Sequence, residues 1–600
     1  MNILRRIQYS KIGRIIFKKG PLLEMARLAR RIAMKIKFEF EERFSKKEKL
    51  VEVLRANFGV YNFQMPETDE VIDIIVPIYN GYDYLVKLFE DLQKTSMKCR
   101  IILVDDKSPD EKVHELEREY AAKHDNVVLI ESEENYGFVK SVNTGLEVAK
   151  GHVALVNTDT ELPTGWLERL MYPILFEEKV GTTTPYTNSG TIFSFPNMGV
   201  NNTIYRGLGV EQIDKHFAKL KPRYISAPTG VGFCMGMNKH AIAEVGVLDY
   251  ETYDRGYGEE NDWCQRAIKA GYKNVQVENL FVYHKHGGSF LSDEKKKLIA
   301  DHLEKLKKRF PKYDLHVGKF VRKDLNKDIR PLMQMMIDTH ETKSVLAFDH
   351  SLGGGATSYL EKKKKEGFQE EICTTTVRYD HVKNVYSIDF ENGEIFLAYE
   401  ALDLKDLLEA GEYLHWDEIW INELVTYPNL WDVLELIKEI KAQQNASLIM
   451  LMHDYFSVCP NINLVTEDYQ YCGLPEESKC QACYNARKYE EQYACPSQKE
   501  WVRKWRAFFE GCTEIRSFSE DTLKRTKQVF GEDLPHTLVP HEVHHMLGIH
   551  KNFSTSDTIT IGLMGMLIHH KGSVLVEQML KEIEEKNLNV RIVLIGKVMG

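Results

Sequence analysis

Residues 71–81 read VIDIIVPIYNG, and the class of fold can be predicted from this stretch and those that follow it. Its first six residues are mostly apolar and β-branched, which is typical of a strand buried on both faces of a sheet. Pro77 and Gly81 end the run, and residues 82–95, YDYLVKLFEDLQKT, follow with the apolar spacing of a helix. The stretch therefore predicts a buried strand and the helix that covers it.

The same alternation continues through residue 156. The runs RIILV (100–104), NVVLI (126–130) and HVALV (152–156) predict three more strands, and residues 110–124 and 138–150 have helical spacing. Strands that alternate with helices form a parallel sheet covered on both faces. Ligands of such sheets bind beyond the carboxyl ends of the strands, so a site is expected at that edge.

Polar residues follow each predicted strand. Asp106 can accept hydrogen bonds from a nucleobase or a ribose, and Asp159 can hold Mg²⁺ or Mn²⁺, which favour carboxylate oxygens. A single acid at a strand end more often caps the next helix, which is the structural alternative. Several of them at one edge favour a site: Asp105, Asp106, Asn135, Gly137, Asn157 and Asp159.

These stretches resemble a known family. IDIIVPIYNG (72–81), VDDKSPD (104–110) and NTDTELPTGW (157–166) look like motifs of family 2 glycosyltransferases, which are inverting enzymes with the GT-A fold. Later stretches resemble the family's Gly-rich acceptor-side loop, its acidic catalytic motif and its closing His segment, in that order: PTGVGFCMGMNK (228–239), GYGEENDWCQRAIKAGY (256–272) and VYHKHGGSF (282–290). The resemblance covers about residues 70–292.

The resemblance implies roles in donor binding. Pro77 and Tyr79 would line the nucleotide base, and Asp106 would bind a uridine or thymidine. Asp159 matches the metal-binding acid of the D-x-D motif, but Asn157 replaces the first acid, so metal affinity is expected to be lower. The nucleotide-sugar residues expected in this half are Pro77, Tyr79, Asp105, Asp106, Asn135, Gly137 and Asn157.

The resemblance also implies the catalytic groups. Glu260 aligns with the general base and Asp262 with the acid that follows it; either can take the proton, and we favour Glu260. His284 matches a late ligand of the metal or phosphate, with His286 as the alternative. Acids are also favoured at a helix N-terminus, which is the structural interpretation of the same motif.

Together these groups suit one reaction. A Mn²⁺ or Mg²⁺ ion on Asp159 and His284 would neutralise a diphosphate leaving group as a Lewis acid. A carboxylate on the opposite face would deprotonate an acceptor hydroxyl as it attacks the sugar carbon. One displacement inverts the anomeric centre and needs one base, unlike hydrolysis, which uses paired carboxylates.

A second α/β module is predicted from residue 343. SVLAFDH (344–350) reads as a strand before a glycine run at 353–355, and EIWINEL (418–424) and SLIMLMHDYF (447–456) add strands. A strand, glycine loop and helix can bind phosphate or sugar through backbone N–H groups, although tight packing also explains such glycines. The segment HDYFSVCPNINLV (453–465) resembles the N-terminal half of family 4 glycosyltransferases of the GT-B type.

Residues 558–580 resemble the opening of the donor-binding half of that fold. Lys571 stands where a diphosphate-binding cation is expected, while Met566 or Leu567 replaces the usual Arg. The sequence stops two strands into that half. We therefore expect the natural protein to continue beyond Gly600, and we do not expect this module to act as an independent retaining transferase as it stands.

Four cysteines follow a C-x7-C-x2-C-x11-C spacing. Four thiolates can bind Zn²⁺ tetrahedrally, and zinc would supply a core that this polar segment lacks. The irregular outer spacings favour the alternative of reduced thiols, as in a cytosolic protein. The four are Cys472, Cys480, Cys483 and Cys495.

The charge is uneven along the chain. Residues 1–50 hold 15 Lys and Arg against five Asp and Glu, whereas the whole chain has a net charge of −10. This basic arm has helical apolar spacing, so it predicts contact with an anionic membrane surface or a hairpin packed on the next domain. The acidic remainder does not favour nucleic acid, and neither an 18-residue apolar run nor a signal peptide is found.

The prediction is a cytoplasmic transferase, peripheral on the inner face of the membrane, that builds a surface polysaccharide or lipid-linked glycan from UDP- or dTDP-sugars. The alternatives are a glycan- or nucleotide-binding scaffold and a nucleotidyltransferase; the latter needs a basic, Gly-rich loop after the first strand, which VPIYNGYDYL lacks. Five parts are expected: a basic helical arm (1–65), the GT-A domain (66–295), a helical linker (296–342), the first GT-B half (343–545) and a truncated second half (546–600).

Overall fold

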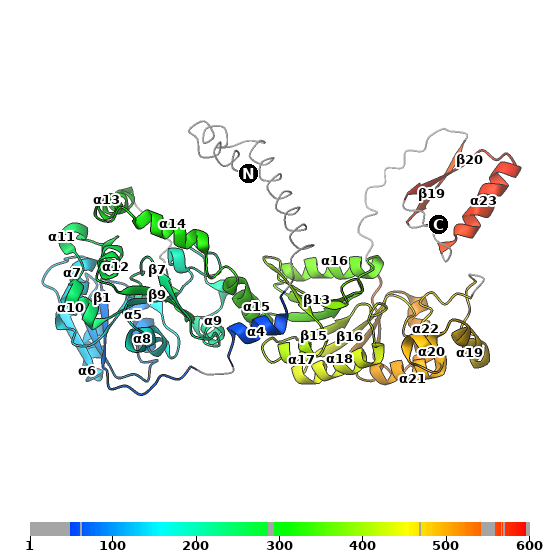
Figure 1. Ribbon diagram of the computed structural model, residues 1–600, viewed down its shortest axis with the longest axis horizontal. Coiled ribbons are helices and arrows are strands. Elements are labelled where there is room, and N and C mark those ends of the chain that lie inside the picture. Colours follow the sequence, from blue (N-terminus) through cyan, green and yellow to red (C-terminus); the bar gives the residue numbers. More distant parts are fainter. Residues whose placement is uncertain are drawn as a thin grey trace.

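The computed structural model describes residues 48–59, 63–285, 293–466, 470–541, 558–565, 567 and 571–595. Two eight-stranded sheets, one in each half of the chain, organise these residues (Figure 1). Residues 1–47, which make up most of the predicted basic arm, lie outside the described part. No helix of the described residues is long and apolar enough to cross a membrane.

The first sheet has the order β3-β2-β1-β4-β8-β6-β9-β7. Strands β1 to β4 are mutually parallel, whereas β8 runs antiparallel to both β4 and β6. The prediction of an α/β fold with a largely parallel sheet is therefore confirmed. The strands are β1 (Ile72–Ile78), β2 (Cys99–Asp105), β3 (Val127–Glu131), β4 (Val153–Val156), β6 (Val180–Tyr186), β7 (Tyr224–Ala227), β8 (Cys234–Met237) and β9 (Lys273–Phe281).

Helices cover both faces of this sheet because successive side chains of a strand point to opposite faces. In β1, Ile74 and Val76 pack in one apolar cluster with α5 and α8, whereas Ile75 packs in another with α7 and α12. The helices are α5 (Tyr82–Asp91), α6 (Glu111–Lys123), α7 (Phe138–Val148), α8 (Trp166–Phe176), α9 (Val210–Phe217), α10 (Lys239–Val245), α11 (Tyr250–Tyr253) and α12 (Glu259–Lys269).

The second sheet has the order β14-β13-β12-β11-β15-β16-β17-β18. Six neighbouring strands are parallel, in the order β12, β11, β15, β16, β17 and β18. The hairpin strands β13 and β14 extend the β12 edge antiparallel. The strands are β11 (Ser344–Phe348), β12 (Cys373–Asp380), β13 (Val385–Glu391), β14 (Phe396–Ala401), β15 (Glu418–Ile421), β16 (Ser447–Met452), β17 (Glu514–Ser517) and β18 (His536–Leu538).

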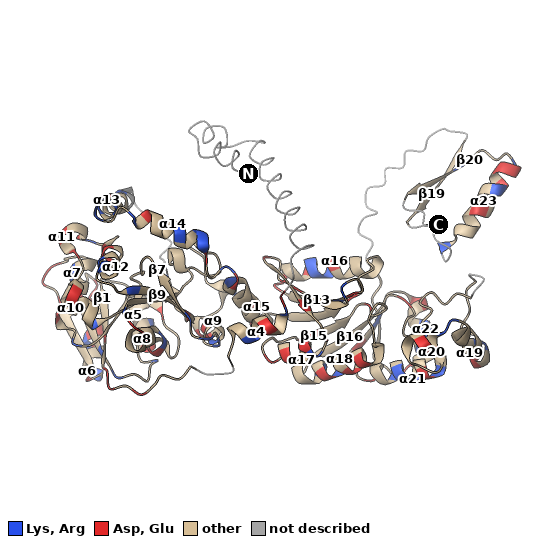
Figure 2. Cartoon of the chain, viewed as in Figure 1, with Lys and Arg blue, Asp and Glu red and all other residues tan. Residues whose placement is uncertain are grey.

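The helices around the second sheet differ in charge. Figure 2 shows Lys and Arg along α16 and Asp and Glu along α17 and α18. The helices are α16 (Gly355–Gln369), α17 (Asp406–Ala410), α18 (Leu430–Gln444), α19 (Glu477–Ala486), α20 (Tyr489–Tyr493), α21 (Gln498–Phe509) and α22 (Glu520–Phe530). The GT-B identity of this half stays a prediction.

The glycine run after β11 is open. A Cβ added at Gly353, Gly354 or Gly355 would meet no atom within 4 Å, so tight packing does not explain these residues. Gly353 and Gly354 instead have φ of +74° and +101°, which side chains rarely adopt.

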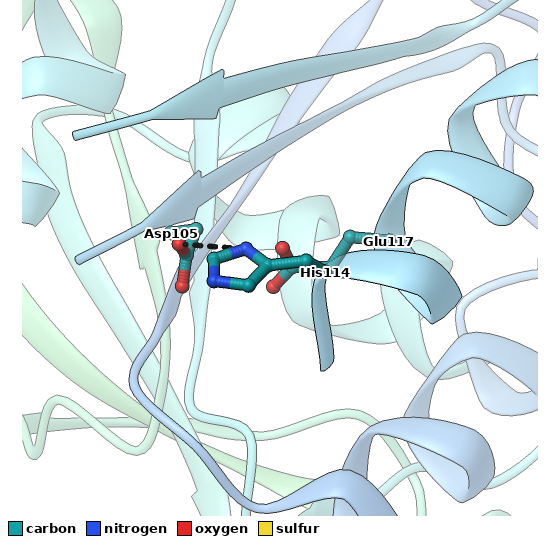
Figure 3. A group of neighbouring side chains, drawn as sticks. All are labelled: Asp105, His114 and Glu117. Carbon is teal, nitrogen blue, oxygen red and sulfur yellow. Dashed lines mark ion pairs between the residues drawn. The ribbon is translucent and has the colours of Figure 1, made fainter. Parts of the chain in front are cut away.

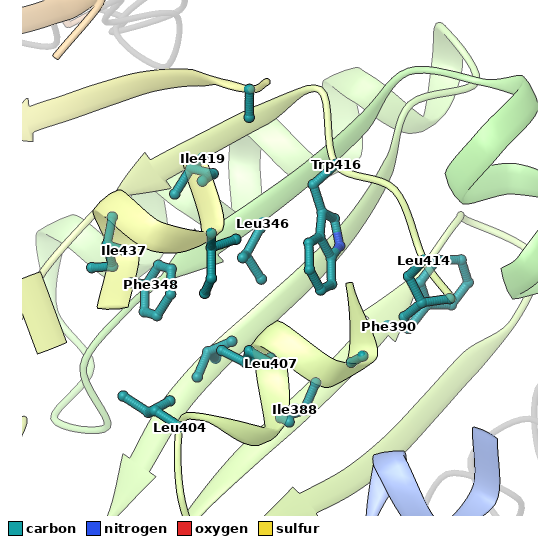
Figure 4. Packing of buried hydrophobic residues seen from close by; sticks show 14 of the residues in the cluster. Leu346, Phe348, Ile388, Phe390, Leu404, Leu407, Leu414, Trp416, Ile419 and Ile437 are labelled. Carbon is teal, nitrogen blue, oxygen red and sulfur yellow. The ribbon is translucent and has the colours of Figure 1, made fainter. Parts of the chain in front are cut away.

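The expected linker between the sheets is helical but is not a spacer. It consists of α13 (Asp293–Arg309), α14 (Tyr313–Lys323) and α15 (Ile329–Glu341). Helix α15 is almost wholly buried, and with α4 (Leu50–Asn57) it lies between the sheets (Figure 1). Both helices belong to one apolar cluster that continues under the second sheet, where Trp416 packs among Leu346, Ile388 and Leu407 (Figure 4).

A small unit forms the C-terminal described part. Strands β19 (Ile559–Met564) and β20 (Val590–Ile595) are parallel and are joined through α23 (Ser573–Glu585).

Candidate functional site

The carboxylate of Asp106 holds the loop that follows β3. Its two oxygens accept the backbone N–H groups of Tyr136 at 2.7 Å and Gly137 at 2.8 Å, and the Asn135 side chain donates to the Asp106 carbonyl at 3.2 Å. Three residues predicted separately, Asp106, Asn135 and Gly137, therefore meet at the carboxyl edge of the sheet. Each carboxylate oxygen retains a further lone pair for a ligand.

Asp105 has other partners. It is buried, accepts the Ser108 hydroxyl at 2.5 Å and lies 3.4 Å from Nδ1 of His114 on α6. Adjacent residues of a strand point to opposite faces, so the two predicted aspartates do not share one set of contacts. Asp105 lies beneath the sheet edge, on the α6 side.

The end of β1 supplies the predicted base-lining residues. Pro77 is buried within the strand, whereas Tyr79 is 54% exposed just beyond it. Backbone N–H of Asn80 donates to the Ser108 hydroxyl at 2.9 Å. The loops after β1 and β2 are therefore held together beside an exposed aromatic ring.

Asp159 and His284 come together from distant parts of the sequence. The two-residue strands β5 (Thr160–Glu161) and β10 (Tyr283–His284) pair antiparallel, with Thr160 opposite His284. Nε2 of His284 lies 3.4 Å from an Asp159 carboxylate oxygen. His286 lies outside the described residues.

Asp159 and His284 present donor atoms that suit a divalent cation, and Asn157, two residues before Asp159, is a candidate third ligand. The Nδ1–H of His284 points to the Ser189 carbonyl at 3.1 Å, which leaves Nε2 as the ring nitrogen that faces Asp159. The Asn157 side-chain oxygen is buried, and no described residue donates a hydrogen bond to it. A buried acceptor of this kind is costly without a partner, and carboxylate, amide and imidazole ligands suit Mn²⁺ or Mg²⁺.

Glu260 stands in the first turn of α12. The Asn261 side chain donates to its carboxylate at 2.8 Å, and a Cβ added at Gly232 would lie 3.9 Å from its side-chain carbons. The next residue, Phe233, stacks its ring on His284 with centroids 5.0 Å apart. The loop through Gly232 and Phe233 thus connects Glu260 to the Asp159–His284 pair.

Burial raises the pKa of Glu260 above its ordinary value. Burial also raises the pKa of the neighbouring Glu259 strongly, and the charge of Glu260 adds to this rise. Buried carboxylates with raised pKa values are candidates for proton transfer.

Asp262 faces a different direction. It is fully buried and ion-paired with Arg266 at 2.7 Å and with Arg309 of α13 at 2.9 Å. Both oxygens therefore have cationic partners, whereas Glu260 has no ion pair within the part of the chain that the structure describes. The structure separates the two acids between which the sequence left a choice.

The sequence interpretation missed the residues that hold α12 from the linker side. Arg309 binds Asp262, and the Tyr313 hydroxyl donates to the Asn261 side chain at 2.5 Å, which also accepts the Thr229 hydroxyl at 3.0 Å. Nothing in the local pattern of the charged segment 296–342 points to these contacts.

The four predicted zinc ligands are not brought within metal-binding distance of one another. No three of the cysteine sulfurs in the described residues lie within 4.8 Å of one another, and Cys495 donates instead to the Ser497 carbonyl. Burial raises the pKa of the Cys459 thiol to about 12, and the nearby thiols of Cys483, Cys472 and Cys480 add to the rise. Cys459, which the sequence interpretation omitted, is thus a neighbour of three predicted members, and zinc binding stays a prediction.

The expected diphosphate cation of the second module lies at the start of its last helix. Lys571 directly precedes Gly572, the N-cap of α23. Met566 lies outside the described residues. Lys571 belongs to the C-terminal unit of β19, α23 and β20 and not to the first module. Its role stays a prediction.

Comparison with known proteins identifies the first half. A family model described as glycosyl transferase family 2 matches residues 73–246. Glycosyltransferase GlyG of Streptococcus pneumoniae is 34% identical over 234 residues, which cover 38% of this chain and 74% of that protein. The chain belongs to glycosyl transferase family 2. The prediction of a glycosyltransferase is confirmed.

Other relatives of this family 2 enzyme are more distant. Glycosyltransferase AglE of Haloferax volcanii is 23% identical over 224 residues, covering 37% of this chain and 68% of that protein. An undecaprenyl-phosphate 4-deoxy-4-formamido-L-arabinose transferase of Pseudomonas fluorescens is 28% identical over 152 residues, 24% of this chain and 44% of that protein.

Solved structures resemble the family 2 enzyme weakly. GalNAc-T7 with UDP, GalNAc and Mn²⁺ aligns at 16% identity and a TM-score of 0.33, covering 44% of this chain and 58% of that chain. The mannosyltransferase PcManGT from Pyrobaculum calidifontis with GDP-Man and Mn²⁺ aligns at 14% identity and the same TM-score, covering 53% and 86%. Similarity at this level carries no argument about donor or metal.

Proposed function

We propose that the first module transfers a sugar, with inversion, from a UDP- or dTDP-sugar to a hydroxyl of a glycan or lipid-linked glycan. The observation that carries this proposal is the continuous set of contacts from Asp159 and His284, through Phe233, to Glu260. A candidate cation-binding pair and a half-buried candidate base thus border the same loop.

Donor binding is assigned to the edge of β1 and β2. The exposed Tyr79 ring offers a stacking surface for a pyrimidine, and Asp106 offers the remaining lone pairs of a carboxylate held rigidly by two N–H groups. Asp159, His284 and Asn157 would hold a divalent cation, which when bound supplies Lewis-acid neutralisation of the diphosphate.

Glu260 is assigned as the general base. Its carboxylate would take the acceptor proton while the hydroxyl attacks the sugar carbon from the face opposite the diphosphate. Asp262 is a positioning residue, because its two ion pairs anchor α12 rather than face the loop of Gly232.

The acceptor is assigned to the class of glycans built on lipid carriers. The similarity to an undecaprenyl-phosphate transferase supports this class. The basic arm of residues 1–50 would then hold the enzyme on the inner face of an anionic membrane. For the second module we propose the first GT-B half, supported by its parallel sheet and the open glycine run after β11.

The test is a donor screen by product mass, with UDP- and dTDP-sugars, Mn²⁺ and a polyprenyl-diphosphate glycan. Glu260→Gln is expected to lower kcat by about 10²–10⁴-fold while binding of the nucleoside diphosphate is retained. Glu147→Gln, an exposed acid on α7, is the matched control and should not change the rate.

Metal use is checked in the same assay. EDTA and Asp159→Ala should each abolish transfer, and added Mn²⁺ should restore only the chelated wild type. Full turnover in excess EDTA, or an active Glu260→Gln chain, would overturn the assigned mechanism.

A further inference from the structure

A second cluster of metal-binding side chains lies under the sheet edge. Asp105 at the end of β2 and His114 and Glu117 of α6 each place a ligand atom within 4.8 Å of the others (Figure 3). Nδ1 of His114 lies 3.4 Å from an Asp105 oxygen. Neighbouring ligands bound at about 2.1 Å to one octahedral ion lie about 3.0 Å apart, so this separation is within a few tenths of an ångström of that of a ligand pair.

Glu117 is the independent observation that points to a ligand. It shares the sheet-facing stripe of α6 with Val113 and Tyr120, where an apolar residue is expected. It is fully buried, and neither carboxylate oxygen has a hydrogen-bond partner among the described residues. A buried carboxylate without a partner is strongly unfavourable unless a cation or a proton neutralises it.

His114 presents the correct nitrogen for a cation. Its Nε2 lies 2.8 Å from the Ser108 carbonyl, which can only accept, so Nε2 carries the hydrogen. Nδ1 is buried and has no hydrogen-bond partner among the described residues. A lone pair on Nδ1 therefore points into the space shared with the two carboxylates.

The charged groups around the cluster do not neutralise its carboxylates. Glu131, opposite Asp105 in β3, lies 3.7 Å from Nδ1 of His114 but is ion-paired with Arg118 at 2.7 Å. Among the described residues, the Asp105 carboxylate accepts the hydroxyl and the backbone N–H of Ser108, and the hydrogen-free Nδ1 of His114 lies beside it. Arg118 thus offsets Glu131, and no described cation contacts Glu117.

We propose that Asp105, His114 and Glu117 bind a divalent cation, of the class of Mn²⁺, that fixes the end of β2 directly before Asp106. The site differs from the Asp159–His284 pair in all its residues, so the proposal does not rest on the proposed function. Its role is structural, because none of its three ligands borders the loop of Gly232 and Phe233.

The competing state is a proton on Glu117. Burial raises the pKa of Glu117 to about 8, and the charge of Asp105 adds to the rise. In that state the residue would be neutral at pH 7 and would bind no ion, which the experiment must distinguish.

The experiment counts Mn²⁺ bound to the full chain by electron paramagnetic resonance of the free ion. Mn²⁺ is chosen as the probe because soft thiolate ligands favour Zn²⁺, so the cysteines of the chain should not compete for it. Asp159→Ala with His284→Ala removes the other proposed cation site, and one Mn²⁺ per chain should still bind. Adding Glu117→Gln should weaken that binding by more than about tenfold, since even outer-shell partners contribute about 10–100-fold.

Glu115→Gln, an exposed acid on the same helix, is the matched control and should leave binding unchanged. If the Glu117→Gln chain fails to fold, His114→Gln is tested in its place, because His114 is partly exposed. This variant should weaken Mn²⁺ binding to the same extent. The proposal is overturned if the Asp159→Ala, His284→Ala chain binds no Mn²⁺, or if Glu117→Gln leaves its affinity unchanged.

Discussion

At the scale of the residue, the contrast between Glu260 and Asp262 shows how environment separates two like side chains. Both acids lie in the first turn of α12 and are two positions apart. Glu260 has an amide donor and a raised pKa, whereas Asp262 is held between two arginines. The geometry therefore favours Glu260 as the proton acceptor.

The raised pKa of Glu260 predicts the acidic limit of activity. A general base acts when ionised, so kcat/KM should fall as pH falls through a pKa above the ordinary Glu value of about 4.3. Asn261→Ala removes the donor that stabilises the ionised form, so it should shift this limb to higher pH. A pH–rate profile measures the shift, and a limb that moves to lower pH would contradict the assignment.

At the scale of the element, α15 joins the modules through one carboxylate. Asp338 is fully buried and accepts hydrogen bonds from Tyr205 at 3.0 Å, from Arg206 at 3.1 Å and from Asn392 at 2.5 Å. These donors come from the first module and from the second. A single side chain of the expected linker thus accepts hydrogen bonds from both modules.

Replacement of Asp338 should therefore destabilise the chain. Asp338→Asn leaves the Arg206 guanidinium without its buried partner, which costs about 3–5 kcal/mol. The midpoint of urea unfolding should fall accordingly. Asp314→Asn on α14 is the control, because its ion pair with Lys307 is exposed and contributes at most about 1 kcal/mol. Equal midpoints for the two variants would show that Asp338 is not a structural anchor.

The sequence predicted the elements better than their contacts. The apolar runs of β1 to β4 were evident because buried parallel strands are continuously hydrophobic. The pairing of Asp159 with His284 came from family resemblance, since no periodicity links residues so far apart. The buried α15 carries an apolar signal in PLMQMMI (331–337), which its charged neighbours obscured.

Other parts of the site could not be predicted from local patterns. One partner of Asp262, Arg309, is 47 residues away on a helix whose sequence is highly charged. Glu117 occupies an apolar stripe of α6, so only its tertiary surroundings show that its carboxylate is buried. Such contacts depend on how distant elements pack, which composition and spacing do not encode.

At the scale of the whole molecule, one apolar cluster joins the second sheet to the ends of β6 and β9, while the first sheet has two further clusters of its own. Leu54 of α4, Phe217 of α9 and Ile337 of α15 belong to the same cluster as Leu346 and Trp416 of the second module. Domains that merely touch have smaller and more polar contacts. The two sheets are therefore expected to lose their structure together.

Hydrogen exchange at increasing urea tests this expectation. Peptides from β1 and β11 should show the same unfolding midpoint, because the shared apolar cluster couples the two sheets. Ile337→Ala, at a fully buried position, should lower the free energy of unfolding by about 2–5 kcal/mol. The urea midpoints of both sheets should therefore fall together. Two separate midpoints, or a change at one sheet only, would show independent domains.

The contacts of α13 and α14 with α12 set the smallest fragment that can be excised with its chemistry intact. A cut at residue 295 would strip Asp262 of Arg309 and Asn261 of Tyr313, and so release the helix that carries Glu260. A fragment that contains the first sheet alone should therefore extend through Glu341. Polar substitutions would then be needed on the apolar face of α15 that becomes exposed in this fragment.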